Sequence, residues 1–142
     1  MAVFASADEL YAHFVPFLEK VSQGELRQKL LSIRSSFKVN NTDPDATLFV
    51  DCVQDSPLIS VGDAAAAATA DIDLTMSADD SHRFWLGELN VIKALATRRV
   101  KFSGPLLKLI GLLPVFQPAF TEYREYLVAN GRRDLLPDQR HQ

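Results

Sequence analysis

The segment from Pro105 to Phe120, PLLKLIGLLPVFQPAF, constrains the fold more than any other part of the chain, because almost all of its residues are apolar. Lys108 is its only charged residue, whereas an ordinary surface helix confines its apolar side chains to one stripe. A helix that crosses a bilayer needs about 20 apolar residues, and this segment is shorter and is interrupted by Gly111, Pro114 and Pro118. It must therefore bury itself in a core, in a lipid, against a partner or on a membrane surface.

The composition is that of a globular chain with a mildly acidic balance. Its 142 residues favour a single domain, residues 1–142, that can bury a core without disulfides. The formal net charge of -3 argues against a general nucleic-acid-binding protein, which would carry a basic excess. Cys52 is the sole cysteine, so no intramolecular disulfide can form. The beginning, MAVFASADEL, lacks a signal-peptide pattern and the end, DQRHQ, is not a retention address, so we expect a cytoplasmic protein.

The first part of the chain carries helical signals. Ser6 followed by Glu9 has the spacing of a capping box, in which both side chains bond to free backbone amides. Apolar residues with helical spacing come next, namely Leu10, Phe14, Phe17 and Val21. Pro16 lies inside this pattern and predicts a kink or a restart. Gly24 ends the segment, and residues 25–31 fit one or two further helical turns.

An alternation of apolar and polar residues then predicts strands. In chain order the predicted strands are residues 33–39, 47–53, 58–61, 72–76 and 100–103. Residues 40–44, NNTDP, have turn composition, and the next strand places Leu48, Val50 and Cys52 on one face. The alanine run 64–68 is ambiguous, because so short a run does not nucleate a helix alone.

The second half of the chain is mainly helical. Residues 77–80 repeat the cap signature and open a helix that Gly87 ends, and Asn90 caps another over residues 91–96. The apolar segment is expected to form a helix that its prolines kink or restart and that Gly131 stops. Strands joined by short turns pair antiparallel, and the helices then cover one face of the sheet. This order predicts an α+β domain.

Two blocks of the sequence resemble the sterol carrier protein 2 family, also called nonspecific lipid-transfer proteins. The first block, ADIDLTMSADD at residues 70–80, is similar to the family's strand that leads into a serine-capped helix. The second, GELNVIKALATRRVKFSG at residues 87–104, matches a family pattern of glycine, leucine, asparagine, lysine and alanine before a strand that ends in glycine. The resemblance covers residues 8–113, and Arg98 stands where the family usually has glycine.

The resemblance implies a five-stranded, mostly antiparallel sheet with helices packed on one face and an apolar cavity between them. It also implies non-enzymatic binding or transfer of a hydrophobic ligand such as a sterol, a fatty acid, an acyl-CoA or an isoprenoid lipid. Residues 113–130 extend past the usual end of the family domain as an additional helix, and residues 131–142 form a polar tail.

The candidate ligand contacts come from the two most apolar stretches, because a cavity for a lipid needs an apolar lining. Phe84 and Trp85 are neighbours that point in different directions, so we expect at least one of them to touch a ligand. Burial in an ordinary core is the competing interpretation for all of these residues. The candidates are Phe84, Trp85, Leu89, Ile92, Leu95, Phe102, Leu106, Leu109, Ile110, Leu113, Phe116 and Phe120.

A small basic cluster offers a candidate contact for an anionic headgroup or a CoA phosphate. Arg98 and Arg99 lie close in sequence to Lys101 and Lys108, and arginine grips phosphate with two parallel hydrogen bonds. A solvated loop and strand edge is the simpler explanation of the same residues. We keep Arg98 and Arg99 as the candidate headgroup contacts.

The sequence carries no recognisable signal for catalysis or metal binding. His13, His82 and His141 are scattered, and no nucleophile elbow, P-loop or dinucleotide fingerprint occurs. The acidic residues of segment 71–80 lack the glycine spacing of a calcium loop, and Cys52 has the pattern of a small core residue. We therefore expect no enzyme, no metal and no cofactor.

Two functions follow as hypotheses. The first is a lipid carrier whose partner is its hydrophobic ligand, acting as a monomer or a homodimer, with transient contact to a membrane surface as a further option. The alternative is an accessory or scaffold subunit of a lipid or isoprenoid-quinone pathway. In that case the additional helix would dock on another protein through its aromatic residues Phe116, Phe120, Tyr123 and Tyr126.

Overall fold

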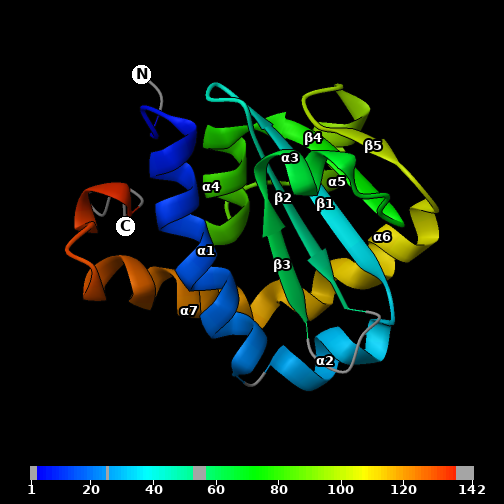
Figure 1. Cartoon of the computed structure of the whole chain (residues 1–142), viewed down its shortest axis with the longest axis horizontal. Coiled ribbons are helices and arrows are strands. Elements are labelled where there is room, and N and C mark those ends of the chain that lie inside the picture. The colour runs from blue at the N-terminus through cyan, green and yellow to red at the C-terminus, as the bar shows by residue number, and fades with distance from the viewer. Residues whose placement is uncertain (1–2, 25, 53–56, 137–142) are drawn as a thin grey trace.

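The computed structural model describes residues 3–24, 26–52 and 57–136 (Figure 1). The elements are, in chain order, α1 (Ala7–Gln23), α2 (Leu26–Ile33), β1 (Ser36–Thr42), β2 (Ala46–Asp51), β3 (Leu58–Val61), α3 (Gly62–Ala67), β4 (Ile72–Ser77), α4 (Ala78–Leu86), α5 (Val91–Ala96), β5 (Lys101–Ser103), α6 (Leu106–Leu112), the 3-10 turn η1 (Leu113–Phe116), α7 (Gln117–Ala129) and the 3-10 turn η2 (Arg133–Leu135).

The strands form one five-stranded sheet in the order β3-β2-β1-β4-β5. Every neighbouring pair is antiparallel except β1 and β4, which run parallel. Between them the chain passes from the edge strand β3 through α3 to the opposite side of β1. The register aligns apolar residues into a row that crosses all five strands: Val61, Leu48, Val39, Leu74 and Phe102. The predicted α+β class and the mostly antiparallel sheet are therefore confirmed.

The two faces of the sheet have different neighbours. On one face lie α1, α4 and the apolar C-terminal segment (Figure 1). Their apolar side chains form the main core together with those of β1, β2 and β4. On the other face the short helix α3 covers Lys38, whose ammonium donates to the carbonyl oxygens of Ala66 at 3.2 Å and Ala68 at 2.7 Å. The ambiguous alanine run is thus a helix that also lies on the sheet.

The helix starts and stops follow the predicted caps. The side chains of Ser6, Ser77 and Asn90 accept hydrogen bonds from the backbone amides three residues further on. Gly87 ends α4 in the left-handed conformation, with a φ of 79°. Pro16 does not divide the first helix, because α1 runs through it as one element with Pro16 on the exposed side.

The first strand lies further along the chain than the alternation predicts. The structure extends α2 to Ile33 and places β1 at Ser36–Thr42, so the predicted turn at residues 40–44 lies mostly within the strand. Asn40 and Asn41 fit there because their side-chain amides have partners on neighbouring strands: Asn40 donates to Asp73 and Asn41 donates to the Ala46 carbonyl. A composition typical of turns is overridden by this cross-strand bonding.

The apolar segment is buried on one side only. It forms α6 and η1 and continues into α7, and its buried residues are Leu109, Leu112, Phe116 and Ala119. Leu106, Leu107 and Ile110 remain exposed, Leu107 by 84%. The expectation that the whole circumference must be covered is therefore not met within this chain, and one apolar side of α6 faces outward.

Candidate functional site

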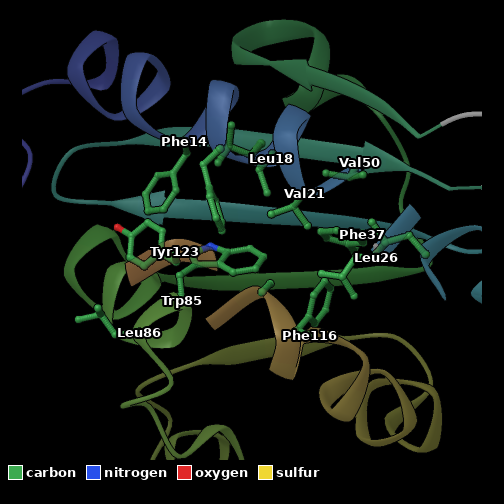
Figure 2. Packing of buried hydrophobic residues seen from close by; sticks show 14 of the residues in the cluster. Phe14, Leu18, Val21, Leu26, Phe37, Val50, Trp85, Leu86, Phe116 and Tyr123 are labelled. Carbon is green, nitrogen blue, oxygen red and sulfur yellow. The ribbon is translucent and has the colours of Figure 1, made fainter. Parts of the chain in front are cut away.

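An apolar cavity lies between the sheet and the helices. Its floor is the apolar face of the sheet, formed by Phe37, Val39, Leu48, Val50, Ile72, Leu74 and Met76. Its walls come from α1, α4, α5, α6 and η1: Phe14, Leu18, Ser81, Phe84, Trp85, Val91, Leu109, Leu112, Leu113 and Phe116. Figure 2 shows side chains of this core converging from the sheet, α1, α4 and the C-terminal segment.

The cavity offers almost no polar group to a ligand. Ser81 is the single polar residue among the described residues that line it, and its hydroxyl already donates to the side-chain oxygen of Asn41. Aromatic rings form one end, where the Trp85 ring centroid lies 5.5 Å from that of Phe116 and 5.3 Å from that of Phe17. Such a lining selects for hydrocarbon and against hydrogen-bonding molecules.

The cavity is small in this conformation. Its volume is about 50 Å³, whereas pockets that hold small organic ligands measure about 300–1,000 Å³. A lipid chain can therefore enter only if a wall moves outward.

The sequence-based candidates divide into three groups. Those that line the cavity are Phe84, Trp85, Leu109, Leu113 and Phe116. Those that are half-buried elsewhere in the core are Leu89, Leu95, Phe102 and Phe120. Those that are exposed are Ile92, Leu106 and Ile110. Phe84 and Trp85 both reach the cavity despite their adjacent positions, and ligand contact at all of these residues stays a prediction.

The sequence analysis did not predict the sheet residues that line the cavity as ligand contacts. Phe37, Leu48 and Ile72 occur in segments that were recognised as strands, but were not chosen as ligand contacts. The signal was available, because alternation places them on the apolar face and that face must turn toward the helices. Phe14 and Leu18 of α1 were also missed, because the sequence does not say which helix crosses the cavity.

The two candidate arginines do not reach the cavity. Arg99 donates from Nε and Nη2 to the carboxylate of Asp80 at 2.8 and 2.6 Å. Asp80 is buried and also accepts from Arg83 at 2.9 Å. Arg98 is exposed and has a φ of 62°, in the left-handed region that favours glycine. A headgroup contact by Arg98 or Arg99 stays a prediction, and the ion pair of Arg99 with Asp80 favours a structural role for Arg99.

Two histidines that are distant in sequence meet at one tyrosine. The Tyr123 hydroxyl lies 2.8 Å from His13 Nε2 and 2.7 Å from His82 Nδ1, and His82 Nε2 lies 2.8 Å from the Leu135 carbonyl oxygen. A carbonyl only accepts, so His82 Nε2 carries its proton and Nδ1 accepts from Tyr123. Tyr123 in turn accepts from His13 Nε2. Burial lowers the pKa of both histidines, that of His13 to about 4, so both are neutral at pH 7.

The only cysteine, Cys52, is buried in the core. Burial raises the pKa of the Cys52 thiol to about 12, which keeps it protonated and unreactive. Among the described residues, no three His, Cys, Asp or Glu side chains gather closely enough to hold a metal ion. Across the same residues, no helix is both long enough and apolar enough to cross a bilayer.

Solved structures with the same fold have low sequence identity to this chain. Sterol Carrier Protein 2 from Yarrowia lipolytica, in its apo form, is 17% identical and aligns over 80% of this chain and 91% of its own, with a TM-score of 0.60. The sterol carrier protein domain 2 of Helicoverpa armigera is 17% identical over 79% and 88% of the two chains, with a TM-score of 0.60. The UbiJ-SCP2 ubiquinone synthesis protein is 9% identical over 80% and 89%, with a TM-score of 0.55.

The sequence itself carries the family assignment. No curated protein matches the chain significantly. The sequence model of the SCP-2 sterol transfer family, in contrast, matches residues 16–116. That range holds all five strands, α4, α6 and η1, and therefore most of the cavity lining. The chain belongs to the SCP-2 sterol transfer family.

Proposed function

We propose that this chain binds the apolar part of a lipid in the cavity between the sheet and the helices and carries it without catalysing a reaction. The observation that carries the proposal is the lining of the cavity. Among the described residues that form this lining, all except Ser81 are apolar, and the Ser81 hydroxyl already donates to Asn41. Membership of the SCP-2 sterol transfer family supports binding of lipids in general. The apolar chemistry of the lining suits a sterol ring system, an acyl chain or an isoprenoid chain.

Burial of hydrocarbon supplies the affinity in this proposal. A ligand that buries about 300 Å² of apolar surface gains roughly 7 kcal/mol at 25 cal/mol per Å², before the costs of association. Part of this gain is spent on opening the cavity, because its present volume is about 50 Å³. A gain of 7 kcal/mol alone corresponds to a dissociation constant of about 10 μM, so a ligand must bury more than about 300 Å² to bind in the micromolar range after these costs.

The wall most suited to opening is α6. It contributes only Leu109 and Leu112 as buried residues, and no side chain caps its N-terminus at Pro105. The opposite walls, α1 and α4, have serine caps and belong to the densely packed aromatic core. Outward movement of α6 therefore exposes less buried surface than movement of α1 or α4 would.

The test combines lipid extraction with a binding titration. Mass spectrometry of organic extracts of the purified protein should detect a co-purified lipid, and cis-parinaric acid should bind at micromolar concentration. Val39→Phe fills the cavity from its floor and should weaken binding at least tenfold. Val128→Phe makes the same change at an exposed site on α7 and should leave binding unchanged. Absence of binding, or equal affinity for both variants, would contradict the proposal.

A second candidate function rests on the exposed apolar side of α6. Leu106, Leu107 and Ile110 are 52%, 84% and 43% exposed, and such a group of residues suits contact with a membrane surface or a protein. Of the four aromatic residues expected to form a docking face on the additional helix, Phe116 and Tyr123 are buried in the core, and Phe120 and Tyr126 are half-buried. Light scattering measures association with protein, and vesicle flotation measures binding to a membrane, in each case for Leu107→Ser and for the unchanged protein. This candidate function is wrong if Leu107→Ser changes neither measurement.

A further inference from the structure

A second groove lies directly behind the wall of the apolar cavity. It measures about 250 Å³ and is lined by Ser35, Ile72, Lys108, Gly111 and Leu112. Among the described residues, Ile72 and Leu112 are the two that line both the groove and the apolar cavity. Ile72 lies in β4, whereas Leu112 belongs to α6, which has only two buried residues. A rotation of Leu112 or a shift of α6 would join the groove to the cavity.

One positive and one negative charge lie together at this groove: Lys108 is part of its lining, and Asp71 contacts the lining residues Ser35 and Lys108. The Lys108 ammonium lies 3.9 Å from the Asp71 carboxylate, and the two side chains are 40% and 51% exposed. Asp71 Oδ2 also accepts from the Ser35 hydroxyl at 3.0 Å and from the Ser36 amide at 3.4 Å. The long gap between Lys108 and Asp71 leaves both partly free to bond to a third group.

Asp71 is fixed to the sheet, while Lys108 moves with α6. The Asp71 amide donates to the Ser36 hydroxyl at 3.0 Å. Gly104, with a φ of 137°, approaches the Asp71 carbonyl so closely that any side chain there would collide with it. One charge is thus anchored beside the start of β4, and the other is carried by α6.

We propose that this groove is the entrance to the lipid cavity and that Asp71 and Lys108 form a headgroup site that favours a neutral hydroxyl over a carboxylate. The inference rests on the proposed function, since it requires a lipid in the cavity. The lipid tail passes between Ile72 and Leu112, and its hydroxyl remains at the mouth, where it donates to Asp71 and accepts from Lys108. The class of ligand is a lipid with a single alcohol headgroup, such as a fatty alcohol or a sterol.

The charge pair explains the discrimination. A hydroxyl both donates and accepts, so it forms a charge-assisted hydrogen bond with each partner and leaves neither ion unpaired. A carboxylate only accepts, so it must displace Asp71 from Lys108 and then lies beside a charge of its own sign. Repulsion from Asp71 offsets the attraction to Lys108, and the expected preference for the alcohol is about tenfold.

Two probes with the same chain measure the headgroup preference. The fluorescence of cis-parinaric acid and of its alcohol, cis-parinaryl alcohol, gives both dissociation constants at pH 8, where the acid is ionised. The alcohol should bind about tenfold tighter than the acid. Asp71→Asn removes the repulsion and should reduce that ratio to about one, mainly by tightening the acid. Asp63→Asn, on exposed α3, makes the same change away from the groove and should preserve the ratio.

The entrance is tested by kinetics. An added Cβ at Gly111 meets nothing within 4 Å, so Gly111→Trp places a large side chain at the groove without disturbing the core. It should slow association of the alcohol at least tenfold in stopped-flow measurements. Leu107→Trp lies on the exposed side of the same helix and should leave the rate unchanged.

The outcomes separate this inference from the proposed function. If neither probe binds, the proposed function fails and the headgroup site fails with it. If both probes bind with equal affinity, or if Asp71→Asn keeps the preference for the alcohol, the headgroup site is wrong while the carrier function stands. If Gly111→Trp and the unchanged protein associate at the same rate, the groove is not the entrance.

Discussion

Tyr123→Phe tests whether the Tyr123 hydroxyl anchors α7 to α1 and α4. The substitution removes this one oxygen and keeps the buried ring. That oxygen has two partners, His13 on α1 and His82 on α4, and Tyr123 is fully buried. The variant leaves the His13 Nε2 proton and the His82 Nδ1 lone pair without the partner that they have now. Both histidines are buried, so water cannot easily replace the hydroxyl.

The expected cost follows from these two lost partners. A buried donor or acceptor left unsatisfied costs about 1–3 kcal/mol, so the two together cost about 2–6 kcal/mol. A domain of ordinary stability has about 5–15 kcal/mol in total, so the loss should be plain in an unfolding experiment. Ring packing against Phe14 and Phe17, at centroid distances of 5.9 and 4.9 Å, is retained by phenylalanine.

Urea unfolding at pH 7.5, followed by the emission of Trp85, measures the effect. Tyr126→Phe is the matched control, because it removes one hydroxyl from the same helix that donates to the His13 carbonyl at 2.6 Å. The control should cost about 0.5–1.5 kcal/mol. If Tyr123→Phe costs no more than Tyr126→Phe, the shared hydroxyl does not hold the helix and the reasoning is refuted.

Three further changes have expected outcomes. Acid should lower the free energy of unfolding, because the pKa of His13 is about 4 in the folded protein and about 6.5 in the unfolded chain. The stability present above pH 6.5 should fall by about 2 kcal/mol by pH 5. In urea titrations, His13→Gln should reduce this dependence on pH. Leu112→Ala should cost about 2–5 kcal/mol in the same titrations and should speed the association of cis-parinaryl alcohol. Arg98→Gly should raise the free energy of unfolding by about 0.5–1 kcal/mol, because glycine accepts the positive φ without strain, and an unchanged or lower value would contradict this.

Much of the fold could be read from local signals. Ser77, Asn90 and Gly87 predict helix ends because their effects act within one turn of backbone, and the structure confirms all three. The strand at Ile72–Ser77 follows from the same kind of local alternation. The prediction was wrong at Asn40 and Asn41, where bonds to neighbouring strands decide the conformation and no local pattern reports them.

The candidate site was predicted less completely than the fold. Phe84, Trp85 and Phe116, which the sequence analysis selected as ligand contacts, line the cavity, because large apolar side chains are driven into the interior. Their contact with a ligand stays a prediction. The same reasoning also selected Leu106 and Ile110, which the structure leaves exposed. Hydrophobicity gives the tendency to be buried, but it does not say which side of a short helix finds a partner.

The apolar segment from Pro105 to Phe120 shows which properties the sequence determines and which the tertiary structure determines. The sequence alone excludes a membrane span, predicts helical turns broken at the prolines and places them after the last strand, because these follow from length, composition and backbone geometry. Tertiary structure decides that Leu109 and Leu112 wall a cavity, that Lys108 meets Asp71, and that His13, His82 and Tyr123 share one hydroxyl. These contacts join residues far apart in the chain, and only the packing of α6 and α7 against the sheet and helices brings them together.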